Sequence, residues 1–71
     1  MTADLELALQ VRENLTATRR DLIYVAVLVL DGEVRLRGCV PSYHIRQVAV
    51  ERARRVPGVR QVVDEMEVAN R

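Results

Sequence analysis

The chain has 71 residues, of which 49% are hydrophobic and 30% are charged, and its formal net charge is +1. A chain this short forms one domain and buries only about 60% of its extended-chain surface, so every apolar stripe must contribute to the core. The only aromatic residues are Tyr24 and Tyr43, and we therefore expect an aliphatic core. No apolar run approaches the roughly 18 residues of a membrane span, and no basic segment followed by an apolar run marks an export signal.

The charges are distributed unevenly along the chain. Residues 1–34 carry three arginines against six acids, whereas residues 35–60 carry seven arginines against Glu51 alone. Residues 61–71 return to a net negative charge. No lysine is present, and the planar guanidinium of arginine suits phosphate and carboxylate groups. The basic region is therefore compatible with anionic partners.

The periodicity of residues 4–15 predicts a first helix. Apolar side chains recur there at the spacing of one helical face, at Leu7, Ala8, Val11 and Leu15. Asp4 and Glu6 are favourably placed in the first turn, where the helix dipole stabilises negative charge. Leu5 and Leu9 lie elsewhere on the helical wheel and are expected to stay partly exposed.

Two alternating apolar runs, residues 23–30 and 33–40, predict a hairpin with Asp31-Gly32 as its turn. A two-residue type I′ turn needs positive φ at both central residues, which Asp and Gly can adopt. Facing residues then have numbers that sum to 63, and a slip of one residue would exchange the two faces. The expected core face carries Ile23, Val25, Val27, Val29, Val34, Leu36 and Val40. The opposite face carries Tyr24, Ala26, Leu28, Leu30, Glu33, Arg35, Arg37 and Cys39.

A second helix is predicted over residues 42–56, with Ser42 as its N-cap and Pro57-Gly58 as its stop. Its expected buried face consists of Ile45, Val48, Ala49, Ala53 and Val56. Its expected solvent face consists of Arg46, Gln47, Glu51, Arg54 and Arg55.

A third strand is predicted over residues 59–68. Val62, Met66 and Val68 share one face of this strand, and Asp64 interrupts that face. Either a bulge or a strand edge turns Asp64 to water, or its carboxylate forms an ion-binding or hydrogen-bonding site.

This order of elements, with these residues, resembles the BON domain, a small bacterial module common in envelope and osmotic-stress proteins. The resemblance covers nearly all of residues 1–71 and implies a single α+β domain, a two-layer αββαβ sandwich. Both helices would lie on one face of a three-stranded mixed sheet, whose central second strand is antiparallel to the first and parallel to the third. The residues that carry the resemblance are Asp4, Leu7, Val11, Leu15, Val25, Val27, Asp31, Gly32, Val34, Leu36, Gly38, Val40, Ser42, Ala49, Ala53, Val56, Gly58, Val59, Val62, Met66 and Val68.

BON proteins usually carry two such domains, or one domain joined to another module, behind an export signal. The chain as it stands has a single copy and no such signal, and is expected in the cytoplasm. A domain taken from a longer exported protein would instead belong in the periplasm or envelope.

The resemblance implies a module that binds phospholipid or other envelope components. The first hypothesis is that four arginines of the second helix contact anionic phospholipid at a membrane surface, namely Arg46, Arg52, Arg54 and Arg55. The alternative is a solvated helix face on which Glu51 pairs with Arg55 at i, i+4.

The second hypothesis is protein–protein assembly through the open sheet face, with a second copy or a neighbouring domain as the partner. The proposed interface consists of Tyr24, Leu28, Leu30, Arg35, Arg37 and Cys39. The alternative is that Arg35 and Arg37 lay their methylene stems across Leu28 and Ala26 and keep the surface hydrated.

The residue inventory argues against an enzyme. His44 is the only imidazole, and Ser42 at a helix N-cap does not form a nucleophile and base with it. Cys39 is the only cysteine, so no internal disulfide forms, and with His44 it supplies at most two of the four ligands that zinc needs. We expect no metal and no cofactor. Nucleic acid also fits poorly, because the chain has no phosphate-binding glycine loop and no aromatic stacking platform.

Overall fold

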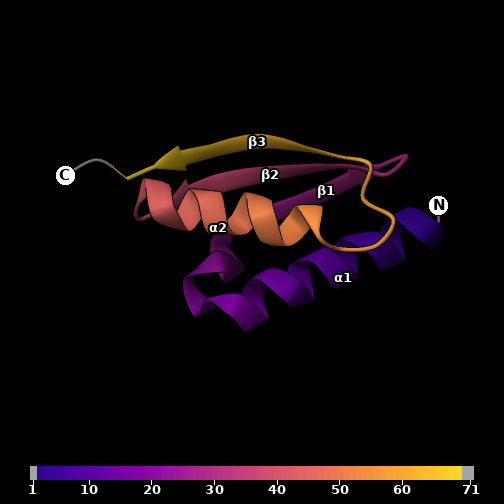
Figure 1. Cartoon of the computed structure of the whole chain (residues 1–71), viewed down its shortest axis with the longest axis horizontal. Helices are drawn as coiled ribbons and strands as arrows, with labels where there is room; N and C mark the ends of the chain where they lie inside the picture. Colours follow the sequence, from indigo (N-terminus) through magenta and orange to yellow (C-terminus); the bar gives the residue numbers. More distant parts are fainter. Residues whose placement is uncertain (1, 70–71) are drawn as a thin grey trace.

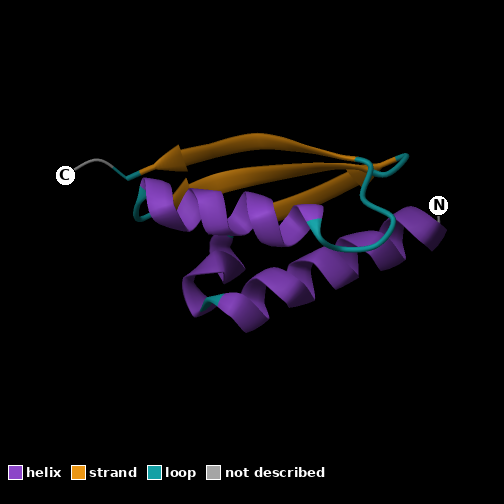
Figure 2. Ribbon diagram, in the orientation of Figure 1, coloured by secondary structure: helices purple, strands orange, loops and turns teal. Residues whose placement is uncertain are grey.

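The computed structural model describes residues 2–69, which form two α-helices, one short 3-10 helix and a three-stranded sheet (Figure 1). In chain order the elements are α1 (Thr2–Thr18), η1 (Arg20–Tyr24), β1 (Ala26–Leu30), β2 (Glu33–Val40), α2 (Tyr43–Arg54) and β3 (Gln61–Val68). Both α-helices lie on the same side of the sheet (Figure 2), with α1 packed on β1, and α2 packed on β2 and β3. The expected α+β fold is therefore confirmed.

The hairpin has the predicted turn and register. Asp31 and Gly32 both have positive φ, 53° and 79°. The β1–β2 pairs run from Leu30 opposite Glu33 to Ala26 opposite Arg37, so each pair sums to 63. Because this register holds, Val34 and Leu36 face the helices and are fully buried.

The first strand begins later than predicted. Residues 20–24 form the 3-10 helix η1 instead of extending β1 back to position 23. Ile23, expected in the core, is 43% exposed, and Leu22 is buried in its place. Two backbone hydrogen bonds close this turn, from Leu22 N to Arg19 O and from Val25 N to Leu22 O. The prediction for Ile23 was wrong because these local bonds replace ladder pairing, which alternation alone cannot reveal.

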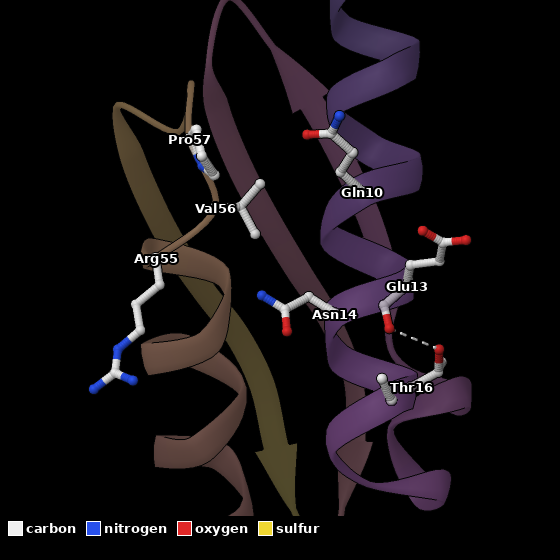
Figure 3. Close-up of a pocket in the computed structure, with 8 residues that line it drawn as sticks. Gln10, Glu13, Asn14, Thr16, Arg55, Val56 and Pro57 are labelled. Atoms are coloured by element: carbon white, nitrogen blue, oxygen red, sulfur yellow. Dashed lines mark hydrogen bonds between the residues drawn. The ribbon is translucent and has the colours of Figure 1, made fainter.

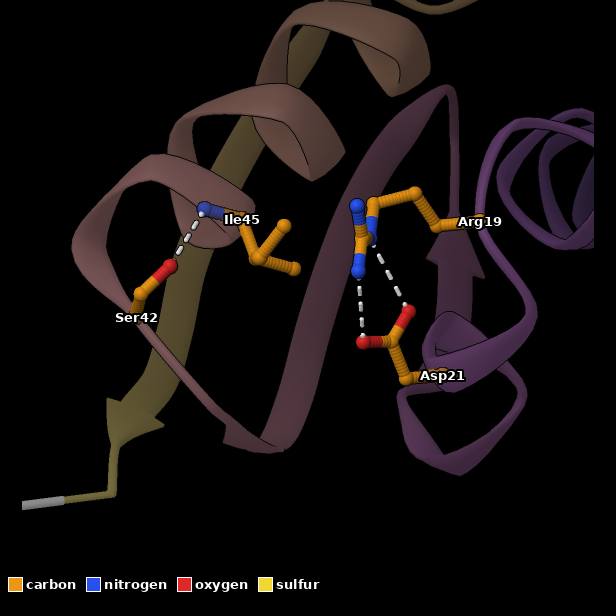
Figure 4. Close-up of polar contacts among 4 residues, drawn as sticks. All are labelled: Arg19, Asp21, Ser42 and Ile45. Carbon is orange, nitrogen blue, oxygen red and sulfur yellow. Dashed lines mark hydrogen bonds and ion pairs between the residues drawn. The ribbon is translucent and has the colours of Figure 1, made fainter.

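The helices differ from prediction mainly in length. α1 extends beyond the predicted 4–15 at both ends, and α2 ends at Arg54 rather than at residue 56. The Ser42 cap is confirmed, since its Oγ accepts a hydrogen bond from the Ile45 N–H at 3.2 Å (Figure 4). Val56 lies beyond the helix but is buried as expected.

The sheet has the expected topology, with β2 between β1 and β3. β3 begins at Gln61 rather than at residue 59, and pairs in parallel with β2, from Glu33 opposite Gln61 to Val40 opposite Val68. At the start of this ladder the Arg60 N–H donates to Gly32 O at 2.8 Å. The segment between α2 and β3 is thereby attached to the hairpin turn.

The core is aliphatic apart from one methionine, and no polar or charged residue among positions 3–69 is buried. Leu5 and Leu9 of α1 are 62% and 56% exposed, as the helical wheel predicts. The buried side chains are Val11, Leu15, Leu22, Val25, Val34, Leu36, Val40, Ile45, Ala49, Ala53, Val56 and Met66.

Candidate functional site

The four arginines proposed for lipid contact do not share one face of α2. Successive residues are about 100° apart around a helix, so Arg46 and Arg52 fall on opposite flanks of the buried stripe formed by Ile45, Ala49 and Ala53. Arg46 lies on the flank next to β3, and Arg52 lies on the flank next to α1. The structure therefore separates Arg46 from the arginines at the other end of the helix.

Arg46 forms an ion pair with Asp64 of β3, with Nε 3.0 Å from Oδ2. The Asp64 Oδ1 also accepts a hydrogen bond from the Met66 N–H at 3.0 Å. The strand is not bulged there, because Asp64 stays in register opposite Leu36. Although β3 is an edge strand, the Asp64 side chain is only 27% exposed and lies against α2. No bulge is therefore present at Asp64, which lies on an edge strand, and its carboxylate is engaged by contacts within the domain.

The guanidinium of Arg46 also lies over the ring of Tyr43, with its Cζ 5.4 Å from the ring centroid. Tyr43 is 69% exposed. The sequence contains only two aromatic side chains, and the other, Tyr24, is 75% exposed. Neither aromatic ring therefore contributes to the core, although a domain of this size has little apolar surface available for packing.

Arg52, Arg54 and Arg55 lie together at the C-terminal end of α2, and we call them the C-terminal arginine cluster. Within residues 2–69, Arg52 and Arg55 form no ion pair, and both are exposed. Arg54 lies 3.9 Å from Glu51, so this acid pairs at i, i+3 instead of with Arg55 as considered above. The helix dipole stabilises cations at this end.

A groove of about 710 Å³ separates α1 from α2 near this cluster (Figure 3). The Asn14 side chain points into the groove and donates to the Arg52 carbonyl oxygen at 3.3 Å. Glu13 and Arg55, which also line it, point away from each other. The side-chain amide of Asn14 therefore connects the two helices beside the groove, and Glu13 and Arg55 do not face each other across it.

The open sheet face carries an apolar column on β1 and a charged column on β2. Leu28 and Leu30 are 49% and 70% exposed. Arg35 and Arg37 both approach Glu65 of β3, at 3.4 Å and 3.1 Å. Sequence reasoning missed Glu65. Its position beside the two arginines depends on the parallel register of β2 and β3, which are far apart in the sequence.

The remaining proposed interface residues differ in position. Cys39 lies on β2 and is exposed, as expected. Tyr24 is exposed but belongs to η1, next to the sheet and not within it.

One carboxyl group of η1 has a perturbed pKa. The Arg19 guanidinium donates two hydrogen bonds to Asp21, at 3.0 Å and 3.1 Å (Figure 4). Hydrogen bonding to the ionised form lowers the pKa of the Asp21 carboxyl and raises that of Arg19. Both side chains are accessible to solvent, so this ion pair stabilises the start of η1 at the protein surface.

Two further observations bear on the kind of site. Within residues 2–69, no three His, Cys, Asp or Glu side chains gather closely enough to hold a metal ion. None of the helices in this part of the chain combines the length and the hydropathy that a membrane crossing requires.

The comparisons with known proteins give one clear match. The family model described as the BON domain matches residues 3–70, which is essentially the whole chain. No curated protein matches the chain significantly.

Proposed function

The chain belongs to the BON domain family, whose members are non-catalytic, lipid- and envelope-associated binding modules, and we propose that it binds anionic phospholipid at a membrane surface. The observation that carries this proposal is the C-terminal arginine cluster. Arg52 and Arg55 project into solvent without an ion-pair partner within residues 2–69, and Arg54 lies between them in sequence. Guanidinium groups in this state are free to bind lipid phosphates bidentately.

The expected binding is weak and reversible. A basic residue near an anionic membrane contributes on the order of 1 kcal/mol, so three arginines provide about 3 kcal/mol at low salt. Since exposed charges are screened within about 10 Å at 0.1 M salt, affinity should fall as salt is added. Arg46, the fourth arginine of the original hypothesis, is committed to Asp64 and contributes mainly by fastening α2 to the sheet.

The test is sedimentation with vesicles of phosphatidylcholine, with or without phosphatidylglycerol, at two salt concentrations. The variant Arg52→Gln/Arg55→Gln removes two unpaired charges from the cluster. The matched control Arg12→Gln/Arg20→Gln removes two exposed arginines that also form no ion pair within residues 2–69. We expect the wild type and the control to bind phosphatidylglycerol vesicles and the cluster variant to bind roughly tenfold less or worse. Equal binding to charged and neutral vesicles would refute the proposal.

A second candidate function is self-assembly through the open sheet face. Leu28 and Leu30 are the observation that favours it, because they expose a column of apolar surface on an edge strand. The same face carries Arg37 and Glu33, so a copy related by a two-fold axis can bring opposite charges together. Light scattering at high protein concentration tests this function. A dimer mass that Leu28→Glu reduces to a monomer supports it, and a monomer mass at every concentration refutes it.

A further inference from the structure

The exposed side of α2 forms one continuous stripe opposite its buried side. The helix positions recur there at i, i+4, i+8 and i+12, and every member of the stripe is exposed. Tyr43 begins the stripe beside the N-cap, and Arg55 ends it. The full stripe is Tyr43, His44, Gln47, Glu51, Arg54 and Arg55.

The ring of Tyr43 is held outward by contacts beneath it. Arg46 is anchored by Asp64 of β3 at 3.0 Å, and its guanidinium lies over the Tyr43 ring. A cation over an aromatic face contributes about 0.5–1 kcal/mol at an exposed site. The ring is therefore supported from the sheet and remains 69% exposed.

Tyrosine rings are favoured at the boundary between lipid headgroups and acyl chains, where the ring is apolar and the hydroxyl stays hydrated. An α2 lying flat on a bilayer would place Tyr43 at that boundary and Arg54 and Arg55 on lipid phosphates about three turns away. The positive charges of Arg54 and Arg55 on this stripe are complementary to the surface of an anionic bilayer, and this complementarity favours a membrane as the occupant of the stripe.

We propose that Tyr43 is a membrane anchor, and that the protein docks on anionic bilayers with α2 parallel to the surface. This inference rests on the proposed function and adds a residue and an orientation to it. Arg46 and Asp64 act through Tyr43 as positioning residues and need not touch lipid.

The absence of tryptophan from the sequence allows a direct test. Tyr43→Trp places the only tryptophan of the chain on the stripe, and Tyr24→Trp places it on η1, at a tyrosine that is similarly exposed. The two proteins are mixed with phosphatidylglycerol vesicles that contain brominated acyl chains. We expect the emission of the position-43 variant to shift to shorter wavelength and to be quenched, and the emission of the position-24 variant to stay unchanged.

A binding measurement completes the test. Tyr43→Ala should bind phosphatidylglycerol vesicles about fivefold more weakly than wild type, since a few tens of Å² of aromatic surface no longer leave water. Tyr24→Ala should bind as wild type does, and circular dichroism establishes that both variants are folded.

The outcomes separate the two proposals. If the proteins sediment with phosphatidylglycerol vesicles but position 43 stays in water, or if Tyr24→Trp is quenched instead, Tyr43 is not the anchor and the proposed function stands. If neither protein sediments with these vesicles, both proposals are wrong.

Discussion

The carbonyl oxygen of Tyr24 occupies the space that a side chain at Gly38 would need. A Cβ built on Gly38 would lie 2.9 Å from the Tyr24 oxygen and 3.3 Å from the Val25 Cα. Gly38 also has a φ of +142°, a conformation that residues with a Cβ rarely adopt. The chain can therefore leave the 3-10 helix and enter β1 only where β2 has no side chain.

Gly38→Ala should consequently destabilise the protein by about 2–4 kcal/mol, because the steric conflict adds to the backbone strain. The measurement is the free energy of unfolding in urea. Gly58→Ala is the matched control, since Gly58 also has a positive φ of +98° but a Cβ there meets only Leu7 side-chain atoms at ordinary distance. If the free energy of unfolding fell no more in Gly38→Ala than in Gly58→Ala, the contact between Tyr24 and position 38 would not contribute to the destabilisation.

Asp64 should contribute to stability through two distinct interactions. Asp64→Ala removes the ion pair with Arg46 and the acceptor for the Met66 N–H, so we expect a loss of about 1–2 kcal/mol. Asp64→Asn can keep the backbone hydrogen bond, and should lose only about 0.5 kcal/mol. A double-mutant cycle with Arg46→Gln measures the pair alone. A coupling energy of zero would mean that the pair does not fasten α2 to β3.

Glu51 is the only acid on the exposed stripe of α2, and it should weaken docking to an anionic membrane. Its neutral counterpart Glu51→Gln removes repulsion from lipid phosphates and releases Arg54 from a pair at 3.9 Å. Binding to phosphatidylglycerol vesicles should therefore strengthen about fivefold. Glu67→Gln, the same change on β3 beyond the stripe, is the control. If the two variants gained the same affinity for the vesicles, the effect would come from net charge alone, and α2 would have no preferred orientation on the membrane.

Asp21 should make a small contribution to the pH dependence of stability. Its pKa is lowered in the folded protein by the hydrogen bonds from Arg19, so the unfolded chain takes up a proton at higher pH than the folded chain. The stabilisation is thus fully present above the unfolded value of about 4, and is lost as the pH falls through the folded value. A carbon-detected NMR titration should give Asp21 a pKa below its ordinary value. In Arg19→Gln that pKa should rise, and an unchanged value would exclude the Arg19 contact in solution.

The sequence was most informative where structure is local. The register of the hairpin follows from Asp31-Gly32 because a two-residue turn determines every pair that follows it. The Ser42 cap follows from the preference of helix N-termini for a hydroxyl acceptor. Both features depend on a few neighbouring residues, and both were predicted correctly.

Features that depend on distant residues were harder to predict. The start of β1 was misplaced because Ile23 continues an alternating pattern, whereas the space above Gly38 decides where the strand begins. Asp64 looked anomalous in a strand, since its partner Arg46 lies on a different element. The arginines of α2 were treated as one row, although Arg46 and Arg52 occupy opposite flanks. Tyr43 was not considered a candidate, although helical spacing alone places it away from the buried positions Ile45, Ala49 and Ala53.

Three segments that are remote in sequence meet at the hairpin turn. Asp4 of α1 accepts a hydrogen bond from the Asp31 N–H at 3.2 Å, and Arg60 donates from its backbone to Gly32 O and from Nη1 to Asp31 O. A turn at the tip of an isolated hairpin can fray alone, whereas opening this one also breaks hydrogen bonds to α1 and to the entry of β3. The Asp31 and Arg60 amide protons should accordingly exchange with solvent more slowly than those of an isolated hairpin turn, and Asp4→Ala should speed the exchange of the Asp31 amide.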